Sequence, residues 1–369
     1  MNIVIRVDSS QQIGSGHLIR CRTLAEELRR NGAEVRFICR EHSGHISECL
    51  SQSAFPVTLL PAPPKPEKQS DDYQAWLGVS QETDAAETIE ALGQIKADWL
   101  IVDHYGLDQI WERKLRPYVN KIFVIDDLAN RPHDCEGLLD QNENIEGETR
   151  YQGLVPEHCF VLVGCRYALL HPEYAEYRKR LKPRTGEVKR IFIFFGGTDA
   201  DNMTGMAIAA LSSPEFTHIN LDVVIGMTNS NRRQLEIQAN KRGKVSIYGS
   251  RPHLADLMAQ ADLAIGAGGT TTWERCCLGL PTIVISVANN QLSTCKFLDQ
   301  SRAILYAGLS SHIDALELRK KIREAIEKRS LLLELSFRSS QLIAGLGSSA
   351  ITQKLYSSKP SSFSELNNV

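Results

Sequence analysis

The sequence lacks a hydrophobic run long enough to cross a membrane. It is 42% hydrophobic over 369 residues, but no stretch stays apolar for the roughly 18 residues that a span requires. Arg6 and Asp8 lie inside the first apolar segment, which is unlike a signal peptide. We therefore expect a protein that stays in the cytoplasm and has no membrane partner.

The sequence also lacks a strong excess of charge of either sign. Its 42 basic and 44 acidic residues give a formal net charge of −2. Binding to a nucleic-acid backbone requires a basic stripe, whereas the basic pairs Arg29-Arg30 and Arg232-Arg233 are scattered and fit solvated helix faces. We therefore exclude nucleic acid as a partner and expect a monomeric globular protein of about two domains.

Paired cysteine motifs are absent. The nine cysteines form no CxxC pair and have no histidine at the spacing of a zinc site. Cys276-Cys277 is the one adjacent pair, and we interpret it as small apolar packing on a buried helix. We expect reduced thiols and no cofactor.

What the sequence does contain is a strand, a glycine loop and a helix within its first 25 residues. Residues 1–7 predict a buried strand, Gly14-Ser15-Gly16 predicts a turn, and the apolar periodicity predicts a helix over 17–31. Backbone N–H groups at such a helix start suit a diphosphate, although the turn can also be a tight connection only.

His17 lies in the first turn of this predicted helix. The positive end of a helix dipole favours a neutral imidazole there, so His17 is the candidate general base for activating water. A helix cap or an ordinary surface histidine is the alternative interpretation.

Polar clusters follow two further predicted strands, at 99–102 and 121–125. The clusters are Asp103-His104-Tyr105-Gly106 and Asp126-Asp127. Because residues past the carboxyl ends of parallel strands line the ligand crevice, we expect both clusters beside the first glycine loop. They can cap turns, bind a polar substrate through His104 and Tyr105, or hold a divalent metal.

The second half repeats this plan after a polar linker at 182–186. A strand at 191–195 leads into Gly196-Gly197-Thr198-Asp199, which predicts a second phosphate-compatible turn. A further glycine loop at 266–270 enters a helix that carries Glu274. Glu274 either accepts hydrogen bonds from the two ribose hydroxyls of a nucleotide or simply complements the helix dipole. Asn290 follows the next strand, where its amide would reach a ligand.

Two α/β domains, each with a glycine loop at a shared cleft, are the plan of the GT-B sugar-nucleotide enzymes. Within that plan, the motifs resemble the UDP-2,4-diacetamido-2,4,6-trideoxy-β-L-altropyranose hydrolases of pseudaminic acid biosynthesis. The resemblance covers residues 1–310 and rests on these motifs in order: Arg6-Val7-Asp8-Ser9-Ser10, Ile13-Gly14-Ser15-Gly16-His17, Asp103-His104-Tyr105-Gly106, Asp126-Asp127-Leu128, Tyr167-Ala168-Leu169-Leu170, Phe195-Gly196-Gly197-Thr198-Asp199 and Asn290-Gln291.

The resemblance implies a GT-B fold, with two Rossmann-like α/β domains facing a central cleft. The expected domains are 1–181, carrying the catalytic loop, and 182–356, binding UDP, followed by a polar tail over 357–369 that we expect to be disordered. In GT-B enzymes the last helices often return to the first domain.

The resemblance also implies a metal-independent hydrolase that releases UDP and the free sugar with inversion at the anomeric carbon. His17 matches the proposed general base of that family. The predicted substrate-binding residues are Gly14, Ser15, Gly16, Tyr105, Gly197, Thr198, Gly269, Thr270, Glu274 and Asn290.

Two other functions remain open. An inverting GT-B glycosyltransferase that uses a UDP-sugar has the same domain plan but needs an acceptor groove. A non-catalytic nucleotide-sugar binding protein would have no reason to hold a base at position 17.

Overall fold

The computed structural model describes residues 1–64, 72–94 and 96–358. The predicted tail lies outside the described residues from position 359 onward, and so does most of the predicted loop over 61–69. Among the described helices, none has both the length and the apolar character needed to cross a bilayer.

The first half of the chain forms a parallel sheet in the order β3-β2-β1-β4-β5-β6-β7. Strand β1 is central, and its Ile3, Val4 and Ile5 are buried because helices cover both faces of a parallel sheet. The strands are β1 (Asn2–Val7), β2 (Glu34–Arg40), β3 (Val57–Leu60), β4 (Trp99–Asp103), β5 (Ile122–Ile125), β6 (Gly137–Asp140) and β7 (Phe160–Val163). The helices are α1 (Gly16–Arg30), α2 (Glu48–Gln52), α3 (Gln81–Leu92), α4 (Gln109–Leu115) and α5 (Pro172–Arg180).

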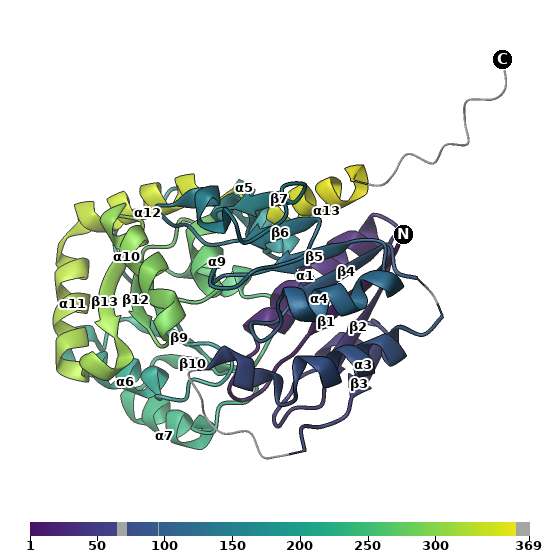
Figure 1. The fold of residues 1–369 in the computed structure, drawn as a ribbon. Helices are drawn as coiled ribbons and strands as arrows, with labels where there is room; N and C mark the ends of the chain where they lie inside the picture. Colours follow the sequence, from purple (N-terminus) through teal and green to yellow (C-terminus); the bar gives the residue numbers. More distant parts are fainter. Residues whose placement is uncertain (65–71, 95, 359–369) are drawn as a thin grey trace.

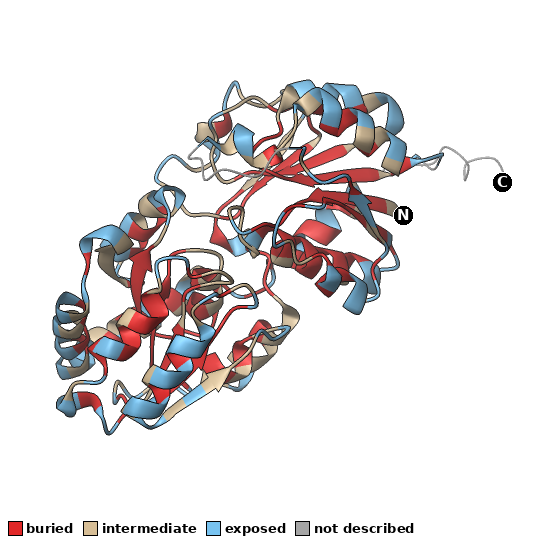
Figure 2. Cartoon of the chain, turned by 90° about the horizontal axis from the view of Figure 1, so that it is seen from below, coloured by how far each residue is buried: buried red, intermediate tan, exposed pale blue. Residues whose placement is uncertain are grey.

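The second half forms another parallel sheet, in the order β10-β9-β8-β11-β12-β13. Figure 2 shows the two lobes, each with buried strands inside and exposed helix faces outside. The strands are β8 (Arg190–Phe194), β9 (Asn220–Val224), β10 (Val245–Tyr248), β11 (Leu263–Ala267), β12 (Thr282–Ser286) and β13 (Leu305–Leu309). The helices are α6 (Met203–Ala210), α7 (Arg232–Arg242), α8 (Ala255–Gln260), α9 (Thr271–Cys277), α10 (Leu292–Gln300), α11 (Ala315–Glu327), α12 (Arg329–Leu342) and α13 (Gly347–Ser357).

Two helices pack against a different domain from the one that their position in the sequence suggests. Tyr174 of α5 lies in the apolar core of the second domain, whereas Ile351 and Leu355 of α13 lie in the core of the first. Figure 1 shows the last helices running back from the second domain to the first. Helix α13 therefore returns to the first domain, as expected for the last helices. The predicted domain boundary between residues 181 and 182 separates α5 from the core in which it packs.

Several elements differ from those predicted. The sequence over 151–171 is apolar and predicts a loop, yet it contains the edge strand β7. Strand β13 and helix α13 are not predicted from the sequence either. Strand β7 has only four residues, and β13 is half-buried and contains Gly308, so neither shows a clear strand pattern. The sequence predicts a helix over 81–96, but α3 ends at Leu92, because Gly93 takes a positive φ of 66° as its C-cap.

Candidate active site

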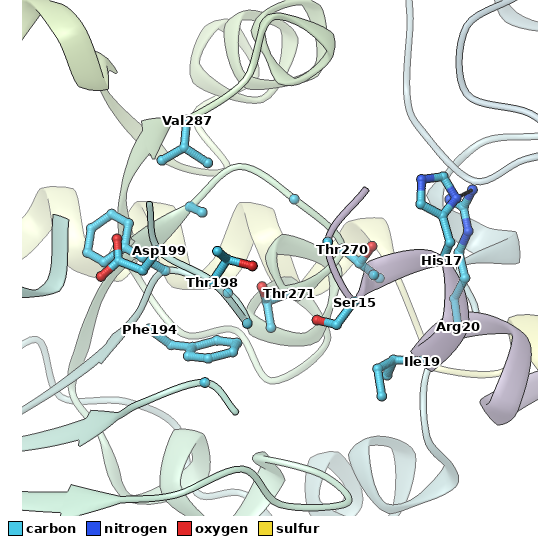
Figure 3. Close-up of a pocket in the computed structure, with 18 of the residues that line it drawn as sticks. Ser15, His17, Ile19, Arg20, Phe194, Thr198, Asp199, Thr270, Thr271 and Val287 are labelled. Carbon is cyan, nitrogen blue, oxygen red and sulfur yellow. Dashed lines mark hydrogen bonds between the residues drawn. The ribbon is translucent and has the colours of Figure 1, made fainter. Parts of the chain in front are cut away.

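A cavity of about 460 Å³ lies between the two domains. It is formed by loops at the carboxyl ends of strands in both sheets, where the parallel topology brings them together. Figure 3 shows His17 and Arg20 projecting from α1, with Thr198 and Thr270 across from them on the other domain. All eleven predicted site residues line this cavity: Gly14, Ser15, Gly16, His17, Tyr105, Gly197, Thr198, Gly269, Thr270, Glu274 and Asn290.

The histidine at the start of α1 is paired with a buried aspartate. His17 is 9% exposed, and its Nδ1 lies 2.6 Å from Oδ1 of Asp103, the last residue of β4. A carboxylate only accepts hydrogen bonds, so this contact assigns the ring proton to Nδ1. The other ring nitrogen, Nε2, is then the one that can take a proton.

Arg20 holds the same aspartate from the next turn of α1. Its Nε donates to Asp103 Oδ2 at 2.7 Å, and its Nη2 donates to Oδ1 at 2.7 Å. Burial raises the pKa of Asp103, but Arg20 and His17 outweigh burial and hold this pKa well below its usual range. Asp103 therefore stays ionised and can orient the imidazole at any physiological pH.

Asp127 fixes a second wall of the site. It accepts hydrogen bonds from the Tyr105 hydroxyl at 2.5 Å, from Arg20 Nη1 at 2.8 Å and from Asn142 Nδ2 at 2.8 Å. The Tyr105 ring stands edge-on to the His17 ring, with centroids 4.6 Å apart. Asp127 thus links Tyr105, which lies beside His17, to Asn142, which follows β6.

Sequence reasoning missed the roles of Asp103, Arg20 and Asp127 as partners. Asp103 and Asp127 were noted only as possible turn caps or metal ligands. The spacing of His17 and Arg20 was the available signal, because residues at i and i+3 of a helix share a face.

His104 is not part of the cavity wall. Its Nδ1 accepts a hydrogen bond from the Gly106 N–H at 2.9 Å, so the ring proton is on Nε2, which points to Asp8 Oδ2 at 3.6 Å. Burial lowers the pKa of His104 to about 3. His104 therefore shapes the 103–106 turn from inside the domain and does not reach a ligand.

The aspartates predicted as possible metal ligands form ion pairs with arginines. Asp103 and Asp127 pair with Arg20, and Asp126 pairs with Arg131 at 2.8 Å. Within 1–64, 72–94 and 96–358, no group of three or more His, Cys, Asp or Glu side chains is arranged to hold a metal ion.

Glu274 projects from α9 into the cavity with an unsatisfied carboxylate. It hydrogen-bonds with Tyr174, but its Oε2 is buried without a partner. Burial raises the pKa of Glu274 to about 7, and Tyr174 and Arg275 oppose that rise only in part. Hydroxyl donors from a ligand would satisfy this oxygen and favour the ionised carboxylate.

The glycine loops of the two domains approach one another closely. A Cβ at Gly197 would lie 2.6 Å from Ser15 Oγ, and one at Gly16 would lie 3.7 Å from Thr270 Oγ1. A side chain at 197 would force the Ser15 hydroxyl to move, so the two glycine loops are in direct contact at this point.

The aspartate of the predicted phosphate turn at 196–199 accepts hydrogen bonds from the start of the next helix. The Asp199 carboxylate accepts hydrogen bonds from the backbone N–H of Met203 at 2.8 Å and of Thr204 at 3.1 Å. The N–H groups of Met203 and Thr204 at the start of α6 are therefore used internally, and the predicted role of the 196–199 turn itself stays a prediction. Gly197 and Thr198 still line the cavity.

The sequence is similar to a known domain family and to several known proteins. Residues 190–341 match the model of the glycosyltransferase family 28 C-terminal domain. The chain is 26% identical over 299 residues to the UDP-2,4-diacetamido-2,4,6-trideoxy-β-L-altropyranose hydrolase of Campylobacter jejuni, covering 81% of this chain and 96% of that protein. It is 23% identical over 361 residues to the spore coat polysaccharide biosynthesis protein SpsG of Bacillus subtilis, covering 96% of this chain and 99% of that protein.

Solved structures share the whole domain arrangement. MurG of Acinetobacter baumannii superimposes with a TM-score of 0.63 at 13% identity, covering 96% of this chain and 99% of that chain. The predicted GT-B fold is confirmed by this match. The chain thus has the GT-B fold, and within its second half residues 190–341 are similar to the glycosyltransferase family 28 C-terminal domain.

Proposed function

We propose that this protein hydrolyses a UDP-linked 2,4-diacetamido-2,4,6-trideoxyhexose to UDP and the free sugar. The proposal agrees with the motifs over residues 1–310 and with the activity for which the Campylobacter jejuni relative is named. The structural observation that carries it is the His17–Asp103 pair at the cavity, which favours catalysis over mere binding, while the motifs and this relative favour hydrolysis over transfer.

In the proposed reaction, Nε2 of His17 takes a proton from water as the water oxygen bonds to the anomeric carbon. The bond from that carbon to the diphosphate oxygen breaks, and its electron pair leaves with UDP. Attack opposite the leaving group inverts the anomeric configuration. Asp103 holds the imidazole in the accepting tautomer and stabilises the imidazolium that forms.

The two domains would divide the substrate between them. Glu274 would accept hydrogen bonds from the ribose hydroxyls, and the loop containing Gly269 and Thr270 would border the diphosphate. Tyr105, held by Asp127, and the amide of Asn290 would contact the sugar. Ser15 and Gly197 lie where the two sets of residues meet.

The direct test is UDP release from a panel of UDP-sugars, with EDTA present and with no acceptor. We expect release from the 2,4-diacetamido-2,4,6-trideoxy sugar, and His17→Phe should lower turnover by ~10² to 10⁴, the usual effect of losing a general base. Near-native turnover of His17→Phe would overturn the assignment of the base.

One observation favours a second candidate, transfer of the sugar to an acceptor. The family 28 C-terminal domain match and the MurG-like arrangement are features of glycosyltransferases. If UDP release from every sugar were negligible with water alone but rose on addition of a hydroxylated acceptor, the transferase would replace the hydrolase.

A further inference from the structure

Arg275 is a buried arginine without a carboxylate partner within the described residues. It is 0% exposed, and Nε and Nη1 have no hydrogen-bond partner, although Nη2 donates to the Ala267 carbonyl at 2.6 Å and to Thr272 Oγ1 at 3.0 Å. Burial lowers the pKa of Arg275 only to about 10, so the guanidinium is protonated at neutral pH. Glu274 interacts with this charge electrostatically but forms no ion pair with it. A buried guanidinium with two unsatisfied nitrogens is costly for a fold, which suggests that it has a function.

The guanidinium lies directly behind the glycine loop of the second domain. A Cβ at Gly266 would lie 2.5 Å from Arg275 Nη1, so glycine at 266 leaves the space that the side chain occupies. The carbonyl that Arg275 holds belongs to Ala267, which lines the cavity together with Gly268 and Gly269. The positive charge therefore lies directly behind the residues of the cavity wall. Figure 1 shows α9, the helix that carries Arg275, in the middle of the molecule.

The cavity wall itself offers little positive charge to an anion. Of the described residues that line it, four are carboxylates: Asp127, Asp199, Asp201 and Glu274. Both arginines of the wall are already paired, Arg20 with Asp103 and Asp127, and Arg251 with Asp256 at 2.9 Å. Apart from the backbone N–H groups of the glycine loops, this wall has no unpaired arginine to balance the charge of a diphosphate among the described residues that line it.

We propose that Arg275 is the electrostatic counterpart of the diphosphate and acts through the glycine loop without touching the ligand. This inference rests on the proposed binding of a UDP-sugar. Within that function, it assigns to Arg275 the preference of the site for the diphosphate. A buried charge in a low-dielectric setting acts over longer distances than a surface one, because solvent and salt screen it less.

The test separates the phosphate contribution from the nucleoside by measuring UDP and uridine binding calorimetrically at pH 8. Arg275→Met should weaken UDP binding by about tenfold or more and change uridine binding by less than about twofold. Arg275→Lys keeps the charge and should retain most of the preference for UDP over uridine. A purely structural role of Arg275 would weaken both ligands alike.

Arg184 provides a matched control in the same domain. Arg184 is a half-buried arginine whose pKa is also lowered to about 10 by burial, but it donates to the carbonyls of Gly279, Met258 and Ala261, none of which lines the cavity. Arg184→Met should leave the ratio of UDP to uridine affinity unchanged, even if it lowers thermal stability.

The outcomes distinguish this proposal from the function on which it rests. If the wild-type protein binds no UDP, the proposed function fails and this inference fails with it. If wild-type binding is normal and Arg275→Met keeps the UDP preference, the role of Arg275 alone is overturned. Should Arg275→Met not fold, Arg275→Gln keeps hydrogen-bond donors without the charge and gives the same comparison.

Discussion

At the scale of single residues, Asp103 determines which nitrogen of His17 can accept a proton. Asparagine at 103 could donate from its amide to Nδ1, which would place the ring proton on Nε2 and remove the base. We expect Asp103→Asn to lower turnover by ~10² to 10⁴ while UDP affinity changes little.

The control for this substitution is a buried carboxylate outside the site. Asp222 is 1% exposed, pairs with Arg190 at 2.9 Å and does not line the cavity. Asp222→Asn should leave turnover near the wild-type value. Equal turnover of Asp103→Asn and wild type in steady-state assays would contradict the positioning role of Asp103.

Glu274 predicts a pH dependence of nucleotide binding. Its pKa is raised to about 7 in the ligand-free site, and ribose hydroxyl donors would favour the carboxylate, so binding would release a proton. UDP affinity should therefore rise as pH increases through about 7 and level off above it. Calorimetry between pH 5.5 and 8.5 measures this change.

Glu274→Gln is the matched variant for this dependence. The phosphate of UDP also titrates, with a second pKa of about 6, but that contribution is common to both proteins. The difference between the two pH curves therefore reports Glu274 alone. Parallel curves would show that the carboxylate does not titrate on binding.

At the scale of elements, α13 ties the end of the chain to the first domain. Ile351 and Leu355 are fully buried in that core, and the Tyr356 hydroxyl donates to the Asn31 carbonyl at 2.6 Å. Leu355→Ala should lower the free energy of unfolding by ~2–5 kcal/mol, as expected for a core leucine. Urea unfolding measures the loss.

An exposed leucine gives the comparison for α13. Leu316 on α11 is 51% exposed, so Leu316→Ala should change the free energy of unfolding by less than about 0.5 kcal/mol. If Leu355→Ala were equally mild, α13 would not be part of the first domain's core in solution.

At the scale of the whole molecule, the proposal assigns nucleotide binding to one half and chemistry to the other. Glu274→Ala removes two hydrogen bonds of about 1.5–3 kcal/mol each if both are charge-assisted, so UDP affinity should fall by roughly 10² or more. His17→Asn should leave UDP affinity nearly unchanged. Calorimetry with UDP on both variants and wild type decides the assignment.

The opposite pattern would reverse the two halves. Loss of UDP binding in His17→Asn, with normal binding in Glu274→Ala, would place the nucleotide on the first domain. A fragment beginning near residue 186 is a poor substitute for this test, because it would lack Arg184 and Tyr174, which bind and pack against the second domain.

The sequence by itself determined the local units of this protein. Strand, glycine loop and helix at 1–31, the loop before Glu274 and the two-domain plan follow from apolar periodicity and from glycine at turns. These signals act over about ten residues, so they identify which side chains stand at strand ends. They placed His17, Tyr105 and Glu274 at the cavity, where the structure also has them.

Tertiary structure alone decided which of those side chains are partners. His17 and Asp103 are 86 residues apart and meet because β4 lies beside β1 in the sheet. The same packing buried Arg275 without an ion-pair partner among the described residues and returned α13 to the first domain. Such contacts depend on sheet order and on the fit of whole domains, and no local pattern in the chain encodes the distance between residues that far apart.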